Sequence, residues 1–192
     1  MQDSKKSLLD ALAQYENSKE YAHYREQEEV VEDHFSKYPH NKDLKSVLLK
    51  VCVLDAFYST NVRMWGINAM AKHILSLNID TALQNGDISI VEKIANFTTP
   101  KGKNRLYSFA SKYCFHHNQK NFVIFDSFTQ KSLLHFQKQD KFCTLKFSQK
   151  NSQDYNILVK VIDEIKTFYG LDTFSNRQID HMLWVYGKEN LK

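Results

Sequence analysis

Residues 97–128, FTTPKGKNRLYSFASKYCFHHNQKNFVIFDSF, set the order of structural elements that we expect in this chain. A compact basic turn, Thr98–Arg105, separates two stretches in which apolar residues recur at helical spacing. The aromatic stretch Phe122–Phe125 then leads to Asp126, which precedes a further helical pattern. The expected order is therefore helix, basic turn, helix, aromatic segment, aspartate and helix.

Asp126 is the only carboxylate between Glu92 and Asp140. The cations of this run are Lys93, Lys101, Lys103, Arg105, Lys112, Lys120, Lys131 and Lys138. Such a field attracts a polyanion, whose affinity comes from phosphate contacts and counterion release. Two interpretations of the acid remain open. Asp126 either only caps the helix that begins near Phe128, or it also stabilises positive charge that develops on a substrate.

The composition favours a helical protein with one substantial core. The 192 residues suffice for one domain. A hydrophobic content of 42% argues against disorder, while only five Gly and two Pro argue against a turn-rich β-sandwich. We expect an all-α protein that is a single domain over residues 1–192. Acidic N-terminal helices (residues 1–40) and C-terminal helices (residues 150–192) flank its core, residues 44–136.

Charge is distributed unevenly along the sequence. Residues 1–40 hold nine acids and five bases, whereas the middle of the chain is positive. This pattern indicates a polarised surface whose nucleic-acid face comes from the middle of the chain. The alternative is an ordinary solvated surface with scattered charges.

Several classes of protein are disfavoured. No apolar run approaches the ~18 residues of a membrane span, and the first ten residues are polar where a signal peptide is apolar. We therefore expect a cytoplasmic protein without membrane contact. Cys52, Cys114 and Cys143 are widely spaced, which fits reduced thiols and offers no zinc motif. We expect no metal and no cofactor.

Three segments together resemble the helix-hairpin-helix DNA glycosylase superfamily, particularly its 8-oxoguanine-glycosylase-like branch. Pro100–Arg105 stands at the place of the hairpin that grips the phosphate backbone. Phe122–Phe128 resembles the segment that bears the family's catalytic aspartate, and Tyr58–Val62 resembles the tip that wedges into the duplex. The resemblance covers residues 44–136 and implies a two-lobed helical bundle with Asp126 as the catalytic residue.

The hairpin departs from the family's pattern at two points. The family has two glycines after the proline, whereas this chain has only Gly102, at a displaced position. Members that also cleave the strand carry a nucleophilic lysine, whose place here falls near Arg105. Arginine stays protonated and cannot form a Schiff base at neutral pH. We therefore expect a monofunctional enzyme, with Lys103 as the alternative nucleophile.

The chemistry of base excision assigns roles to further residues. A base inside a duplex must be flipped out, so a wedge fills the gap and aromatic side chains stack on the base. The predicted DNA contacts are Ser59, Thr60, Asn61, Lys101, Gly102, Lys103, Arg105 and Lys112. The predicted base pocket consists of Phe115, His116, Phe122 and Phe125, although each aromatic residue is also a plausible core residue.

The predicted function is excision of a damaged or modified base from duplex DNA by a monomeric DNA glycosylase. Hydrolysis of the N-glycosidic bond builds positive charge on the sugar, and a carboxylate at Asp126 would stabilise that charge and orient water. The alternative is a non-catalytic DNA-binding module on the same scaffold. A third class, a helical interaction protein, predicts no salt-dependent affinity for DNA.

Overall fold

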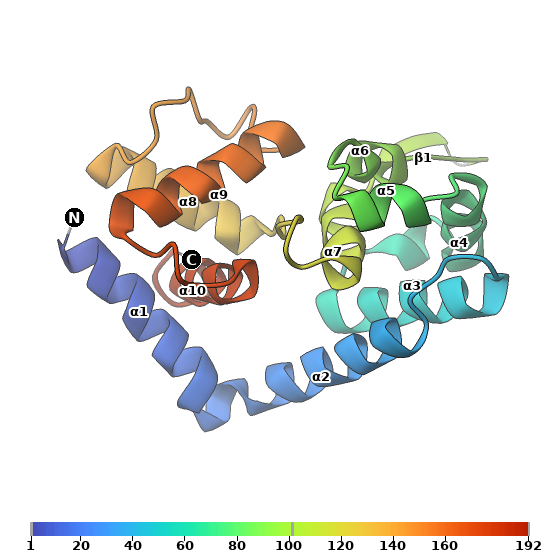
Figure 1. The fold of residues 1–192 in the computed structure, drawn as a ribbon, viewed down its shortest axis with the longest axis horizontal. Helices are drawn as coiled ribbons and strands as arrows, with labels where there is room; N and C mark the ends of the chain where they lie inside the picture. The colour runs from blue at the N-terminus through green and yellow to red at the C-terminus, as the bar shows by residue number, and fades with distance from the viewer. Residues whose placement is uncertain (1, 101, 192) are drawn as a thin grey trace. The chain divides into compact units, whose positions relative to one another are not determined.

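The computed structural model describes residues 2–100 and 102–191, and helices dominate it (Figure 1). The helices are α1 (Gln2–Asn17), α2 (Ala22–Lys37), α3 (Leu44–Tyr58), α4 (Ile67–Ser76), α5 (Asp80–Asn85), α6 (Ser89–Ala95), α7 (Tyr107–His117), α8 (Ser127–Asp140), α9 (Tyr155–Tyr169) and α10 (Asn176–Asn190), with 3₁₀ turns η1 (Lys19–Tyr21) and η2 (Val62–Met64). Strands β1 (Asn96–Thr99) and β2 (Gly102–Arg105) form one small sheet. The prediction of a mainly helical protein is confirmed.

The chain divides into two compact units. Unit 1 combines Met1–His23 with Val123–Lys192, and unit 2 is Tyr24–Phe122. The boundaries differ from the expected partition, because the predicted core 44–136 is split after Phe122 and α8 belongs with the helices of both termini. No described helix combines the length and the apolar character needed to cross a membrane.

Unit 1 is built around α10, which packs against both α1 and α8 (Figure 1). The ring of Tyr15 on α1 stacks on His181 of α10, with 3.7 Å between their centroids. On the other side, the Ser132 hydroxyl of α8 donates to the Leu183 carbonyl of α10 at 2.6 Å. Gly187 allows this close approach, since a Cβ there would meet the Phe128 carbonyl and would lie 2.7 Å from the Ser132 oxygen.

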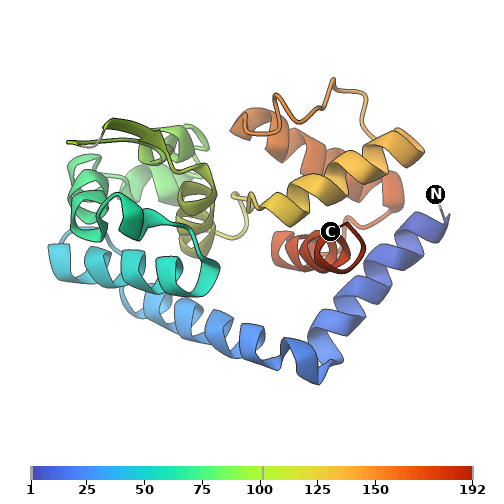
Figure 2. The same cartoon turned by 180° about the vertical axis from the view of Figure 1, so that it is seen from behind.

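Unit 2 is built around α3, which packs against α4 and α7, while α6 also packs on α7 (Figure 2). The sequence offers Asn41 or Asp43 as the cap of α3, and Asp43 is the residue that caps it, because its carboxylate accepts the Ser46 amide at 2.9 Å. The core side chains of this unit include Val47, Val51, Leu54, Met70, Ile74, Val91, Ile94, Phe109, Tyr113 and Phe115. Except for Phe115, which we predicted to line the base pocket, these residues follow the helical spacing of the sequence.

Three local predictions were wrong. Apolar residues at helical spacing predict a helix from about Val62 to Leu77, but this helix begins only at Ile67, because Gly66 has φ of 114° and interrupts the pattern after η2. The basic turn before α7 is an antiparallel ribbon in which Thr99 pairs with Gly102 and Asn96 with Arg105. The sequence predicts Asn176 as the cap of the last helix, but Ser175 caps it and forms a capping box with Gln178.

Candidate functional site

Asp126 occupies the N-cap of α8, as the capping interpretation predicted. Its Oδ1 accepts the Phe128 amide at 2.8 Å, and its carbonyl accepts the Gln130 amide at 2.9 Å. The residue is half-buried, so its carboxylate is not sealed within the core. The cap holds the carboxylate in one orientation at the start of α8.

The segment before Asp126 is fixed by a tyrosine of α9. The Tyr155 hydroxyl accepts the Val123 amide at 2.8 Å and donates to the Val123 carbonyl at the same distance. Tyr155 is 1% exposed, and the residues from Phe122 to Phe125 are all buried. The extended aromatic segment is therefore a rigid support for the carboxylate that follows it.

A second rigid element of the predicted site is the tip between α3 and α4 in unit 2. The buried Asp55 carboxylate accepts the Thr60 hydroxyl at 2.9 Å and the Val62 amide at 2.7 Å. Thr60 is buried by this contact, whereas Ser59 and Asn61 are exposed and both have positive φ. Of the two predicted wedge residues, Asn61 is exposed on this anchored turn, whereas Thr60 is buried.

The tip continues into η2 with two exposed side chains that the sequence did not single out. Arg63 is exposed and its amide also faces the Asp55 carboxylate, at 3.3 Å. Met64 is 63% exposed, which is unusual for a large apolar side chain on an ordered turn. Asn61, Arg63 and Met64 together form what we call the tip surface.

The ribbon carries the remaining predicted phosphate contacts. Gly102 and Lys103 are exposed on β2, while Lys101 lies outside the described residues. Arg105 is exposed but engaged, because its Nη2 lies 2.5 Å from Glu92 Oε1 and its guanidinium lies 4.4 Å from the Tyr107 ring centroid. Among the described residues of the ribbon, Lys103 is therefore the lysine whose side chain is exposed.

Lys112 differs most from its predicted role. Its side chain is 2% exposed, donates to the Ser108 hydroxyl at 2.8 Å, and lies 5.7 Å from the Tyr58 ring centroid. Its ammonium group is therefore held inside unit 2 by contacts within the protein. We predicted Lys112 to be a surface cation because the local charge pattern does not show that a lysine is buried between packed helices.

The predicted pocket aromatics lie mostly in the core. Phe115, Phe122 and Phe125 are all buried, consistent with the alternative that they are core residues. His116 is also largely buried, yet it borders a cavity and its Nε2 lies 3.0 Å from the Tyr58 hydroxyl. This contact links α7 to the end of α3, directly before the tip.

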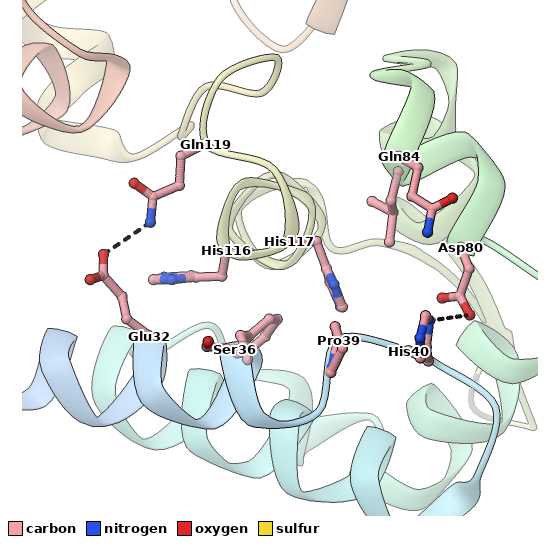
Figure 3. A pocket seen from close by; sticks show the side chains of 11 residues that line it. Glu32, Ser36, Pro39, His40, Asp80, Gln84, His116, His117 and Gln119 are labelled. Atoms are coloured by element: carbon pink, nitrogen blue, oxygen red, sulfur yellow. Dashed lines mark hydrogen bonds and ion pairs between the residues drawn. The ribbon is translucent and has the colours of Figure 1, made fainter.

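A cavity of about 490 Å³ opens within unit 2 (Figure 3). Its walls come from the C-terminal half of α2, the segment after it, α5 and the C-terminal end of α7. The lining residues are Glu32, Phe35, Ser36, Pro39, His40, Asp80, Leu83, Gln84, His116, His117 and Gln119. The Gln119 amide donates to Glu32 at 3.0 Å, and His40 Nδ1 lies 3.8 Å from Asp80 (Figure 3).

A buried lysine that sequence reasoning missed stands behind this cavity. Lys50 is fully buried, and its Nζ lies 3.1 Å from the His40 carbonyl, 3.1 Å from Asn41 Oδ1 and 3.3 Å from His117 Nε2. Burial lowers the pKa of Lys50 to about 8, although Asp80 and Asp43 oppose this shift. The available signal was its spacing, since Lys50 falls on the stripe formed by Val47, Val51 and Leu54.

The predicted site residues are divided between the two units. Ser59, Thr60, Asn61, Gly102, Lys103, Arg105, Lys112, Phe115, His116 and Phe122 belong to unit 2, whereas Phe125 and Asp126 belong to unit 1. Within unit 2 the structure brings His116 and Lys112 to Tyr58 beside the tip. The described residues contain no cluster of three or more His, Cys, Asp or Glu arranged to hold a metal ion.

Comparison with known proteins gives one family. A family model described as an N-terminal domain, HI_0787_N, matches residues 7–121. This chain belongs to the HI_0787_N family. An uncharacterized protein of Haemophilus influenzae is 35% identical over 147 residues, which cover 76% of this chain and 68% of that protein. No solved structure matches the chain.

The HI_0787_N match includes the tip, the ribbon and the whole cavity, and it ends before Asp126. Neither the name of this family nor that of the relative states an activity. The resemblance to DNA glycosylases therefore stays a prediction.

Proposed function

We propose that this protein binds DNA and hydrolyses an N-glycosidic bond with Asp126 as its carboxylate. The observation that carries the proposal is the position of Asp126 on a rigid support. One oxygen is fixed by the Phe128 amide, the preceding segment is fixed by Tyr155, and the side chain is not enclosed. A carboxylate held in this way can stabilise an oxocarbenium-like sugar without reorganising during the reaction.

The same carboxylate can orient the attacking water. Hydrolysis requires a water molecule on the sugar face opposite the departing base, and a carboxylate accepts its proton as the bond breaks. Oδ1 of Asp126 is already used by the helix amide, and a carboxylate oxygen can accept more than one hydrogen bond. Capping and catalysis are therefore compatible roles for this residue.

Unit 2 supplies the DNA contacts in this proposal. The tip surface presents an amide, a guanidinium and an apolar side chain on a turn that Asp55 anchors. An apolar or polar side chain on such a tip can fill the gap left by a flipped base. The ribbon contributes the side chain of Lys103, which is exposed on β2.

The second candidate function is a DNA-binding module without catalysis. The observation that favours it is that Asp126 already has a structural task as the cap of α8. If the protein is an enzyme, wild type releases free base from at least one modified duplex and leaves an abasic site. If the protein is a non-catalytic DNA-binding module, it binds duplex DNA tightly and in a salt-sensitive way, and it releases no free base.

A substrate panel tests the proposal directly. Duplexes that carry oxidised purines, alkylated bases or modified pyrimidines are incubated with wild type and with Asp126→Asn, and abasic sites are counted. Asparagine caps helices about as well as aspartate, so the variant keeps the fold. Release by wild type that is lost in Asp126→Asn supports the enzyme, and equal release by both proteins overturns the role of Asp126.

Strand cleavage needs a separate arm, because Lys103 is the alternative nucleophile. A lysine that attacks the sugar carbon forms a Schiff base, which borohydride reduces to a stable covalent complex with DNA. Monofunctional hydrolysis by Asp126 predicts no trapped complex. A complex that disappears in Lys103→Ala would instead assign the nucleophile to the ribbon.

A further inference from the structure

We infer that the cavity of unit 2 binds a neutral nucleoside, and that Lys50 positions His117 to donate a hydrogen bond to its base. The site lies wholly within unit 2 and includes neither Asp126 nor the tip surface. Its ligand chemistry follows from the protonation of one histidine, from the size of the cavity and from the charges of its walls.

The protonation of His117 follows from its contact with Lys50. An ammonium group has three protons to donate and no lone pair to accept with. Lys50 Nζ has three neighbours at hydrogen-bonding distance, which are the His40 carbonyl, Asn41 Oδ1 and His117 Nε2. His117 Nε2 must therefore be the acceptor. Its ring is neutral and carries the proton on Nδ1.

The surrounding network holds Asn41 in the orientation that this arrangement requires. Its Oδ1 accepts from the Tyr113 hydroxyl at 2.5 Å as well as from Lys50, so the oxygen must face these two donors. Its Nδ2 donates to Asp80 Oδ1 at 2.8 Å, and its backbone amide donates to the same carboxylate at 3.0 Å. These contacts therefore fix which atom donates and which atom accepts in each hydrogen bond from Asp80 to Lys50.

The remaining nitrogen of His117 is available to a ligand. His117 lines the cavity in Figure 3, and no described residue hydrogen bonds to its Nδ1. Burial, followed by the charges of Lys50 and His40, holds the pKa of His117 well below its usual value. A neutral ring with its proton on Nδ1 donates a hydrogen bond, so the matching ligand atom is an acceptor such as a carbonyl oxygen or a ring nitrogen.

The other residues that line the cavity indicate which chemical groups of the ligand lie near that acceptor atom. The Phe35 ring lies 4.9 Å from the His117 ring and 5.3 Å from the His116 ring, centroid to centroid, which gives the cavity an aromatic side. Glu32 and Asp80 contribute carboxylate oxygens that accept from amino groups, and Gln84 contributes an amide. A planar ring with neighbouring acceptors and donors matches this combination, as a nucleobase does.

The volume of the cavity and the charges of its lining residues further restrict the chemical class of the ligand. About 490 Å³ falls within the range of small-molecule pockets and admits a base with its sugar. The two carboxylates of Glu32 and Asp80 outnumber the one ammonium group of Lys50 behind the cavity, which disfavours a phosphate inside it. The base can come from a free nucleoside or from a nucleotide turned out of DNA whose phosphates stay outside. Only the second source rests on the proposed function.

Histidine NMR tests the positioning step without any ligand. In protein labelled with ¹⁵N at histidine, the inference predicts that His117 shows the tautomer protonated at Nδ1 from pH 6 to pH 7.5. Lys50→Met removes the donor to Nε2 and is expected to produce a mixture of tautomers. A wild-type His117 protonated at Nε2, or an unchanged signal in Lys50→Met, would overturn the role of Lys50.

Titration with adenosine, guanosine, cytidine and thymidine tests the ligand. We expect at least one of them to bind and to shift the His117 signals. His117→Leu is expected to weaken that binding at least tenfold, while His117→Asn, whose amide can place a donor near the same position, recovers most of it. His73→Leu is the matched control, because His73 is a histidine of unit 2 outside the cavity. Absence of binding for all four, or equal binding by His117→Leu, contradicts the inference.

Two further arms identify the source of the base. Asp126→Asn should leave nucleoside binding unchanged, so a failure of base excision does not imply a failure of this site. A duplex with one unpaired base is then compared with a fully paired duplex. If His117→Leu weakens binding of the first duplex only, the nucleotide comes from DNA. If neither duplex is affected while nucleosides bind, the ligand is a free nucleoside.

Discussion

The Thr60 hydroxyl donates to the buried Asp55 carboxylate at 2.9 Å, and this contact anchors the turn between α3 and α4. Asp55→Asn replaces one of the two acceptor oxygens with an NH2 group, which faces either the Val62 amide at the Oδ1 position or the Arg63 amide at the Oδ2 position. Leaving such buried donors unsatisfied costs about 1–3 kcal/mol, so we expect a loss of stability of that size in urea unfolding.

Asp33→Asn is the control for this prediction, because Asp33 is an exposed acid of the same unit. Its free energy of unfolding should stay within about 0.5 kcal/mol of wild type. If the tip contacts DNA, Asp55→Asn also weakens DNA binding at concentrations where it is fully folded. Equal stability of the two variants would show that Asp55 does not anchor the turn.

Lys50 should impose a dependence of stability on alkaline pH. Between about pH 8, its folded pKa, and its ordinary value of 10.5, the unfolded chain holds the lysine proton and the folded chain does not. The penalty for burying the charged form is therefore present below pH 8 and is relieved as the pH rises. The free energy of unfolding of wild type should rise relative to Lys50→Met, by at most about 3 kcal/mol.

The comparison with Lys50→Met separates this effect from the thiols. Burial raises the pKa of Cys114 and of Cys143, and these groups act in the opposite direction at alkaline pH, but they are common to both proteins. Urea unfolding at pH 7.5 and at pH 10 provides the measurement. A stability difference that does not change between these pH values would contradict the buried position of Lys50.

Gly187 should be intolerant of a methyl group. A Cβ at this position would meet the Phe128 carbonyl and the Ser132 hydroxyl of α8. Gly187→Ala would force α8 and α10 apart, and such overpacking costs about 1–3 kcal/mol although alanine favours a helix. Thermal unfolding of the variant measures the loss. An unchanged or higher midpoint would show that the two helices do not approach this closely.

Lys103 should contribute to DNA affinity through a phosphate. If it contacts one phosphate, Lys103→Ala weakens binding of unmodified duplex and lowers the slope of log Kd against log salt concentration by about 0.9. Lys45 on α3 is exposed in the same unit and serves as the control. Equal slopes for Lys103→Ala, Lys45→Ala and wild type would remove the ribbon from the DNA interface.

Local patterns predicted much of the fold. Helical spacing located most helices, and the cap at Asp126 was predictable because it depends on a contact only two residues away. Gly66 was a weaker signal, since a glycine can continue a helix or interrupt it according to its φ. The strands were not predicted, because their pairing from Asn96 to Arg105 leaves short segments without clear alternation.

The site was less predictable because it depends on tertiary packing. Lys112 and Lys50 are both lysines on helices, and only the folded structure shows that both are buried. The cavity joins His40, Asp80 and His117, which are distant in sequence and form no motif. The charged run around Asp126 is likewise one feature in the sequence but is divided between two units in the structure.

The most direct test of the central claim compares two capping aspartates of unit 1. Asp126 caps α8 and Asp154 caps α9, where its Oδ1 accepts the Asn156 amide at 3.0 Å. Single-turnover release of base is measured for wild type, Asp126→Asn and Asp154→Asn on the modified duplex that wild type processes best. We predict that Asp126→Asn is slower by at least about 10²-fold, while Asp154→Asn matches wild type. Equal rates for all three proteins would contradict a catalytic role for Asp126.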